Sequence, residues 1–135
     1  MIIGIGTDIA DMERIGRLLS GERGDAFLRR VLTEAERQHI RTEKGGNQRM
    51  IEYTAGRWAA KEAVVKALGC GIGGTVGLHD IEVLPDRRGK PACTLSDDAW
   101  GRLGYGSPGE PRPVIHISIT HAAKLASAFA VVERL

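Results

Sequence analysis

The sequence has no uninterrupted apolar run that approaches the roughly 20 residues needed for a bilayer-spanning helix. Its first eight residues lack the basic start and the long apolar centre of a signal peptide. Only two cysteines are present, Cys70 and Cys93, and they are too far apart to form a CxxC pair. These absences argue against a membrane protein and predict reduced thiols in a cytoplasmic location.

The sequence also has few aromatic residues and little excess of either charge. The chain carries two each of Trp, Tyr and Phe and a formal net charge of +2, with no dense Lys/Arg block. That is too little for base stacking and backbone binding, so we expect no nucleic-acid partner. Arg14 and Arg17 lie in an arginine-rich segment that acidic residues interrupt. Two interpretations stay open for this segment: a solvated face, or a docking surface for an acidic partner.

A length of 135 residues, 42% of them hydrophobic, fits one globular domain over residues 1–135. Periodicity predicts strands at residues 2–9, 81–84, 92–95, 114–120 and 125–133. Helices are predicted between these strands, most of them between the first strand and the later four, and the longest covers residues 47–68. This order predicts an α+β fold, with a small, mainly antiparallel sheet packed against one long and several short helices. The last strand is apolar on both faces, which predicts burial on both sides.

Capping signals set the expected helix ends. Thr33 and Glu36 match a capping box at the start of a short helix. Residues 44–47 predict a turn, and Asn47 at its end predicts the N-cap of the long helix. Gly69 predicts a left-handed residue that terminates this helix.

Glu62 occupies an unusual place on the predicted long helix. At about 100° per residue it falls on an apolar stripe, made up of Ile51, Ala55, Trp58 and Val65. A buried carboxylate is costly unless a cation, metal or hydrogen-bond donor compensates it, so Glu62 is a candidate site residue. The alternative is a solvent-facing ion pair with Lys66, four residues further on.

Asp8 is the second carboxylate of interest. It follows the first predicted strand, where it is either a helix N-cap or a ligand. Gly4 and Gly6 share its face of the strand, so another element is expected to pack closely there. If that element is the long helix, Asp8 and Glu62 meet. Two carboxylates with waters and substrate phosphates are a common ligand set for Mg²⁺.

The glycine-rich segment of residues 69–74 and His121 are weaker candidates. The segment lacks Walker-loop spacing and follows a helix instead of opening one. Because a helix C-terminus repels phosphate, a phosphate there would need Lys66, loop N–H groups or a metal. The alternative is a plain C-cap and turn. His121 ends a predicted strand and is either a phosphate contact or a structural residue.

Two longer motifs resemble a known family. Residues 4–9, Gly-Ile-Gly-Thr-Asp-Ile, are similar to the opening motif of the holo-(acyl-carrier-protein) synthases. Residues 56–69, Gly-Arg-Trp-Ala-Ala-Lys-Glu-Ala-Val-Val-Lys-Ala-Leu-Gly, are similar to the second motif of that family. Shorter matches bring the resemblance to nearly the whole chain, at residues 32–33, 80–83, 89–91 and 117–121. Residues 104–113 are rich in Gly and Pro, are expected to be mobile and receive no role.

The resemblance implies a Mg²⁺-dependent 4′-phosphopantetheinyl transferase. Such enzymes move the phosphopantetheine arm of coenzyme A onto a serine of apo acyl carrier protein and release adenosine 3′,5′-bisphosphate. It also implies a homotrimer with active sites between neighbouring protomers. Carried over to this chain, Asp8 and Glu62 would ligate Mg²⁺ and form the catalytic set with Lys66, while Arg14 and Arg17 would dock the carrier protein. The residues implied for coenzyme A are Arg57, Lys61, Lys66, Gly69, Gly71, Gly73 and His121.

Some alternatives stay open at this point. The acceptor of the serine proton is either Glu62 or a metal-bound water, and the water is favoured because a ligand carboxylate is a weak base. A non-catalytic module that binds coenzyme A or carrier protein is a second function class, although a pure binder would not need the metal pair. A Mg²⁺-dependent phosphohydrolase is a third. The kind of carrier protein, fatty-acid or polyketide, is not determined by the sequence.

Overall fold

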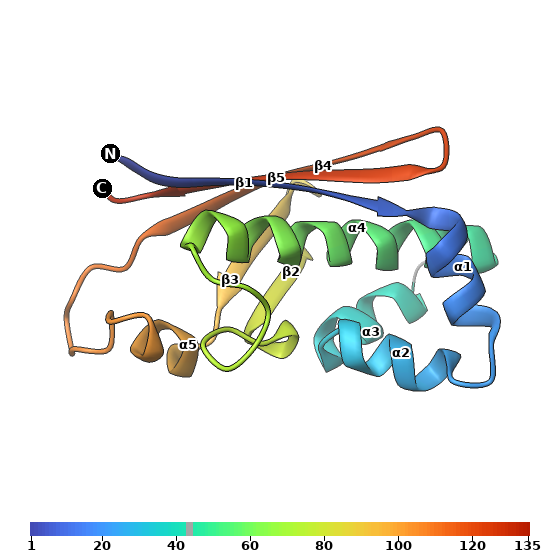
Figure 1. Cartoon of the computed structure of the whole chain (residues 1–135), viewed down its shortest axis with the longest axis horizontal. Helices are drawn as coiled ribbons and strands as arrows, with labels where there is room; N and C mark the ends of the chain where they lie inside the picture. Colours follow the sequence, from blue (N-terminus) through green and yellow to red (C-terminus); the bar gives the residue numbers. More distant parts are fainter. Residues whose placement is uncertain (43–44) are drawn as a thin grey trace.

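The computed structural model describes residues 1–42 and 45–135, which form two antiparallel sheets and a long helix between them (Figure 1). The strands are β1 (Ile2–Asp11), β2 (Ile81–Pro85), β3 (Pro91–Leu95), β4 (Val114–Ala122) and β5 (Leu125–Glu133). The helices are α1 (Met12–Ser20), α2 (Gly24–Val31), α3 (Glu34–Thr42), α4 (Gly46–Leu68) and α5 (Asp97–Arg102), with a 3₁₀ turn η1 (Leu78–Asp80). The predicted α+β class is confirmed.

The larger sheet covers one side of α4. Its strand order is β1-β5-β4, and each neighbouring pair is antiparallel. In Figure 1 this sheet lies above α4, the β2–β3 hairpin lies below it, and the two chain ends lie side by side. The register pairs Asp8 with Ala128 and His121 with Ala126. Because β5 separates β1 from β4, Asp8 and His121 belong to opposite edge strands of the sheet.

Two glycines let β1 approach α4 very closely. A Cβ atom at Gly4 would stand 1.8 Å from the carbonyl oxygen of Ala67, and one at Gly6 would stand 1.9 Å from that of Ala63. Only glycine therefore fits at these two positions, as is usual where another backbone closely approaches a strand. The expected packing of the glycine face of β1 is confirmed. It places Asp8, on the same face of the strand, against α4.

The end of β1 differs from the expectation. Its pairing with β5 continues to Asp11, opposite Leu125, so Asp8 does not end the strand. The proposed N-cap role of Asp8 is wrong, because Asp11 caps α1 instead. Asp11 Oδ1 accepts a hydrogen bond from the backbone N–H of Glu13 at 2.9 Å. The carboxylate of Asp8 is thus free of helix capping.

Helix α4 ends as predicted but begins differently. Gly69 follows it in the left-handed conformation with φ of 80°, which confirms the predicted C-terminus. At the other end, Gly45 is the N-cap without a side-chain hydrogen bond, and the helix begins at Gly46. The prediction of Asn47 as the cap is wrong, because this residue lies inside the first turn. Lys44, at the start of the predicted turn, lies outside the described residues.

A buried ion pair joins α3, α4 and the smaller sheet. The predicted capping box is confirmed: the N–H of Thr33 donates to Glu36 Oε1 at 2.8 Å, and the N–H of Glu36 donates to Thr33 Oγ1 at 3.2 Å. Lys61 Nζ of α4 donates to the same Glu36 oxygen at 2.7 Å, and both side chains are fully buried. Glu36 Oε2 accepts from the backbone N–H of Val83 in β2 at 2.8 Å.

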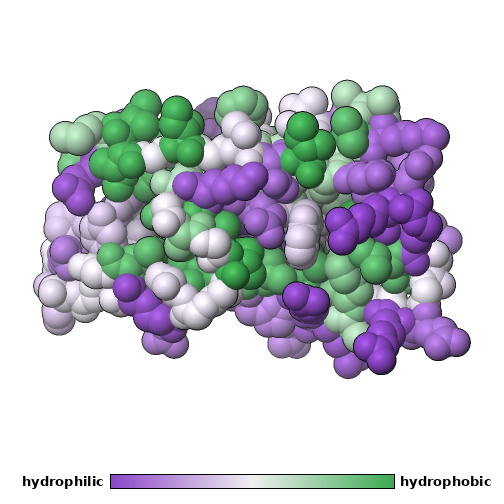
Figure 2. Space-filling view, viewed as in Figure 1, coloured by the Kyte–Doolittle hydropathy of each residue, from purple (hydrophilic) through white to green (hydrophobic). Residues whose placement is uncertain are grey.

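The outer face of the larger sheet is apolar and open. Phe129 of β5 is 56% exposed, and Ile5 and Ile9 of β1 are 66% and 63% exposed. Figure 2 shows hydrophobic side chains gathered along the margin where this sheet lies. The expected burial of the last strand on both sides is wrong for a single chain, because no described element covers this face. Among residues 1–42 and 45–135, no helix is long and apolar enough to cross a membrane.

Candidate active site

Asp8, Glu62 and Lys66 come together where β1 packs on α4. Lys66 Nζ donates to Asp8 Oδ1 at 3.1 Å and to the carbonyl oxygen of Thr7 at 3.0 Å. In the described part of the chain Lys66 therefore pairs with Asp8 across the strand–helix interface. The i,i+4 pair between Lys66 and Glu62 that the sequence left open is not the one formed. The carboxylate of Glu62 lies near both Lys66 and Asp8 and is not engaged by Lys66.

The electrostatics of Glu62 reflect this setting. Glu62 is half-buried on α4, one turn before Lys66. Burial raises the pKa of its carboxyl, the charge of Asp8 raises it further, and the charge of Lys66 lowers it. The charge of Asp8 is thus close enough to disfavour the ionisation of Glu62. A bound cation removes that repulsion, so the pair is an electrostatically favourable place for one.

The donor set fits a hard divalent cation as far as the chain supplies ligands. Mg²⁺ prefers oxygen ligands and commonly takes one or two carboxylates, with waters and phosphates for the rest. Asp8 and Glu62 provide the two carboxylates. Within the described residues, no group of three or more His, Cys, Asp and Glu side chains gathers as a complete metal site. A cation here must therefore complete its coordination with water or with substrate.

Lys61, which was predicted to contact coenzyme A, is occupied inside the protein. Besides Glu36, its Nζ donates to the carbonyl oxygens of Val31 at 2.7 Å and Leu78 at 3.0 Å. These three bonds use all the protons of the ammonium group. Burial lowers the pKa of Lys61, and Glu36 counteracts this by raising it. Because Lys61 has no exposed surface, it cannot contact a ligand in this arrangement. Its contacts stabilise the fold.

Arg57 lies on another side of α4. Its Nε donates to the carbonyl oxygen of Val83 at 3.3 Å, and its guanidinium carbon stands 3.9 Å from the ring centre of Tyr53. Burial lowers the pKa of Arg57, while Tyr53 and Glu36 raise it. Five residues separate Arg57 from Glu62, which amounts to about 140° around the helix axis. A single chain therefore does not bring Arg57 beside the carboxylate pair.

His121 is also separated from the carboxylate pair. It lies near the end of β4, and its Nε2 stands 2.9 Å from the carbonyl oxygen of Glu52 in the first half of α4. A Cβ atom at Gly56 would stand 3.1 Å from the same nitrogen, so the helix leaves room for the imidazole. Since β5 lies between β4 and β1, His121 and Asp8 are not neighbours within one chain.

The glycine-rich loop of residues 69–74 opens beside the Lys66 end of α4. A Cβ atom at Gly71, Gly73 or Gly74 would meet no atom within 4 Å. The plain C-cap is present, because the N–H of Gly69 donates to the carbonyl oxygen of Lys66 at 3.1 Å. The empty space around the remaining glycines leaves room for a ligand against the backbone.

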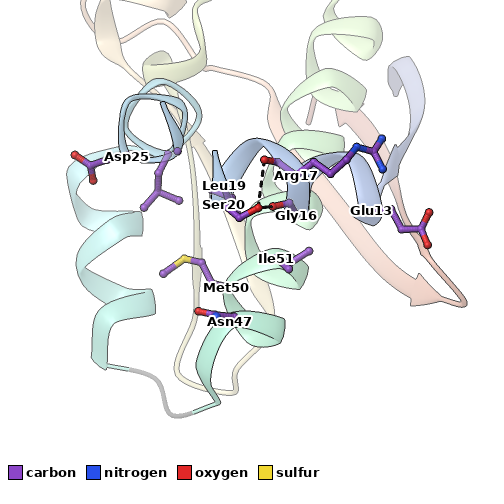
Figure 3. Close-up of a pocket in the computed structure, with 11 residues that line it drawn as sticks. Glu13, Gly16, Arg17, Leu19, Ser20, Asp25, Asn47, Met50 and Ile51 are labelled. Atoms are coloured by element: carbon purple, nitrogen blue, oxygen red, sulfur yellow. Dashed lines mark hydrogen bonds between the residues drawn. The ribbon is translucent and has the colours of Figure 1, made fainter. Parts of the chain in front are cut away.

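The two predicted docking arginines, both on α1, line different pockets. Arg14 lines a pocket of about 210 Å³ together with Leu18 and Trp58. Trp58 precedes Glu62 by four residues, so this pocket lies one turn along α4 from the carboxylates. Arg17 lines a groove of about 820 Å³ between α1, α2 and the first turns of α4 (Figure 3). The larger groove contains neither carboxylate, so its size does not mark the reactive site.

The whole chain matches one protein family. The family model of the 4′-phosphopantetheinyl transferase superfamily matches residues 4–111. The holo-[acyl-carrier-protein] synthase of Anoxybacillus flavithermus is 43% identical over 135 residues, which are all of this chain and 98% of that protein. This chain belongs to the holo-(acyl-carrier-protein) synthase family. The predicted family and the predicted class of enzyme are both confirmed.

Two crystal structures of holo-(acyl-carrier-protein) synthases share the fold. The enzyme of Bacillus anthracis, in complex with CoA (3′,5′-ADP), is 41% identical with a TM-score of 0.78 and matches 98% of this chain and 97% of its own. The enzyme of Neisseria meningitidis is 34% identical with a TM-score of 0.82 and matches 99% of this chain and 100% of its own.

Sequence reasoning missed two ion pairs that shape the fold, Lys61 with Glu36 and Arg102 with Asp80. Glu36 was found through its capping box, but its partner Lys61 is 25 residues away and could not be inferred from local spacing. Asp80 stands in a short motif that contributed to the resemblance, and its partner Arg102 gave no signal at all.

Proposed function

We propose that this synthase transfers the 4′-phosphopantetheine arm of coenzyme A to a serine of apo acyl carrier protein, and that the whole chain acts as one transferase domain. The observation that carries the proposal is the cluster of Asp8, Glu62 and Lys66, which sets two carboxylates and a cation beside an open glycine loop. Family membership supports the same reaction.

Asp8 and Glu62 are proposed to hold Mg²⁺, which when bound offsets the charge of a diphosphate and of the departing phosphate. Lys66 supplies a second positive charge. Its side chain is 54% exposed, whereas Asp8 is 17% exposed, so the ammonium can turn from Asp8 towards a phosphate oxygen while Asp8 stays in place. Phosphoryl transfer asks a protein mainly for this positioning and charge neutralisation.

In the proposed reaction the serine oxygen of the carrier protein forms a bond to the β-phosphorus of coenzyme A. The bond between that phosphorus and the bridging oxygen breaks, and its electron pair leaves with adenosine 3′,5′-bisphosphate. The serine proton passes to Glu62 or to a water that Glu62 orients.

The proposed coenzyme A contacts extend beyond the carboxylate pair. The loop glycines 69, 71 and 73 would approach the diphosphate, and Arg57 and His121 would contact phosphates. Because these two side chains lie away from Asp8 in one chain, the arrangement favours a site completed by a neighbouring protomer. The open apolar face of the larger sheet supports an interface between protomers, since exposed apolar patches mark interaction surfaces. The assembly that we propose is a homotrimer.

Docking of the carrier protein is proposed at the start of α1. Arg14 lines the 210 Å³ pocket one turn from Glu62, so an acidic partner held by Arg14 would be near the carboxylates. Arg17 lies further along the same helix and lines the larger groove.

One experiment tests the proposed function against its alternatives. The protein is mixed with coenzyme A, Mg²⁺ and apo carrier protein, and the carrier is weighed by mass spectrometry. We expect the mass of one phosphopantetheine group to be added. Binding of coenzyme A without any added mass would indicate a non-catalytic module, and release of phosphate from coenzyme A without carrier protein would indicate a phosphohydrolase.

The metal assignment is tested with a matched pair of variants. Glu62→Gln should keep the fold and lose nearly all Mg²⁺-dependent transfer. Glu52→Gln makes the same change on the same helix, where the exposed carboxylate accepts from Gln48 at 3.3 Å, and should leave transfer unchanged. Full activity of Glu62→Gln at saturating Mg²⁺ would remove Glu62 from the metal site.

A further inference from the structure

The glycine-rich loop is held at its far end by side chains outside the proposed site. Residues 69–77 connect α4 to η1, and Val76 is the fully buried residue of this segment. The N–H of Gly73 donates to the carbonyl oxygen of Val76 at 2.9 Å. The glycines before Val76 have open space around them. Cys70 and Ile72 pack against the core at the near end of the loop, and contacts near residues 75–77 fix its far end.

Arg102 of α5 makes one of those contacts directly and supports a second through Asp80. Its Nε donates to the carbonyl oxygen of Thr75 at 2.8 Å, and one terminal nitrogen donates to Asp80 Oδ2 at 2.8 Å. The same Asp80 oxygen accepts from the backbone N–H of Gly77 at 2.8 Å. One guanidinium and one carboxylate thus fix the loop at both Thr75 and Gly77.

Asp80 is itself fixed to α5 by a second residue. Ser96 Oγ donates to Asp80 Oδ1 at 2.6 Å, and the N–H of Ser96 donates to the carbonyl oxygen of Asp80 at 2.8 Å. Ser96 Oγ also caps α5 by accepting from the N–H of Ala99 at 3.1 Å. Both partners of the loop, Asp80 and Arg102, therefore belong to one hydrogen-bonded unit with α5.

We propose that Asp80 and Arg102 are positioning residues that hold the glycine-rich loop in the form that binds the diphosphate of coenzyme A. This inference rests on the proposed function, because it assigns the loop to coenzyme A. Neither residue touches the reacting atoms. Without the guanidinium, the loop populates other conformations, and the apparent Kd rises as the fraction of the binding-competent loop falls.

The experiment compares Arg102→Gln with the control Arg112→Gln. The control also removes an Arg–Asp pair of α5, between Arg112 and Asp97 at 2.6 Å, but it leaves the loop untouched. Titration calorimetry should give a Kd for coenzyme A raised about 3- to 10-fold in Arg102→Gln, as expected if a tenth to a third of the loop stays competent. In the control the Kd should be unchanged. At saturating coenzyme A, kcat and the KM for carrier protein should stay as in the wild type.

Amide hydrogen exchange of the ligand-free protein separates this inference from the proposed function. In Arg102→Gln, residues 69–77 should exchange faster than in the wild type and in Arg112→Gln. Unchanged exchange would overturn the positioning role, as would an equal rise of Kd in both variants or a fall of kcat at saturating coenzyme A. Failure of the wild type to bind coenzyme A would instead overturn the proposed function on which the inference rests.

Discussion

The contact between β1 and α4 makes Gly6 the most informative position for substitution. Gly6→Ala places a Cβ atom 1.9 Å from the carbonyl oxygen of Ala63 and 2.8 Å from the backbone nitrogen of Ala67. Ordinary contacts begin at 3.4 Å, so the strand must withdraw from the helix by about 1.5 Å. Both partners are backbone atoms of a helix, which cannot turn aside as a side chain could.

Two effects are expected from this displacement. Overpacking of a core contact costs about 1–3 kcal/mol, which is about 4–12 °C of Tm in a chain of this size. Asp8 follows Gly6 by two residues on the same face, so it moves away from Glu62. A misplacement of about 1 Å at a reacting centre lowers turnover by about 100-fold.

The assay pairs calorimetric unfolding with Mg²⁺-dependent transfer, measured at a temperature at which the variant is folded. Gly101→Ala is the control, because a Cβ atom there meets nothing within 4 Å. Since Gly101 lies in helix α5, the control should be neutral or stabilised by about 0.5–1 kcal/mol. Wild-type Tm in Gly6→Ala would refute the close contact. A lower Tm with unchanged kcat would refute its link to the Asp8–Glu62 geometry.

Four other changes test separate parts of the molecule. Lys61→Met removes the cation that pairs with the buried Glu36 carboxylate, so urea unfolding should show a loss of about 3–5 kcal/mol in the free energy of unfolding; a loss below about 1 kcal/mol would contradict the buried pair. Burial raises the pKa of Asp80, but hydrogen bonds and a nearby guanidinium outweigh it and lower the pKa below 3.8. The ionised form therefore stabilises the fold above pH 3.8, and the Tm deficit of Asp80→Asn should shrink as pH falls below that value; a constant deficit would argue otherwise. Arg14→Glu should raise the KM for carrier protein more than that for coenzyme A, and equal effects would exclude a dedicated docking residue. Phe129→Glu should convert a trimer to monomers in sedimentation, whereas a wild-type protein that sediments as a monomer would exclude the proposed assembly.

The candidate site divides into a part that local sequence could reach and a part that it could not. Glu62 and Lys66 share a helix, so their neighbourhood follows from a spacing of four residues. Asp8 was placed beside them because glycines on its strand face required a close neighbour. In contrast, the predicted coenzyme A contact of Lys61, which is adjacent to Glu62 in the chain, does not agree with the structure. A lysine within a family motif suggested a ligand contact, but only the packing of α3 shows that Glu36 occupies it.

By itself, the sequence determined the α+β class, most of the strands, the capping box, the C-terminus of α4 and the family. Each of these depends on period, turn chemistry or motif, which act between residues close together in the chain. Only the tertiary structure decided that β1 runs on to Asp11, that Lys66 pairs with Asp8, and that Arg57 and His121 stand apart from the carboxylates. Those outcomes depend on which segments meet across the sheet and around α4. Such tertiary contacts depend on the packing of residues that are distant in the chain, and no local sequence pattern predicts them.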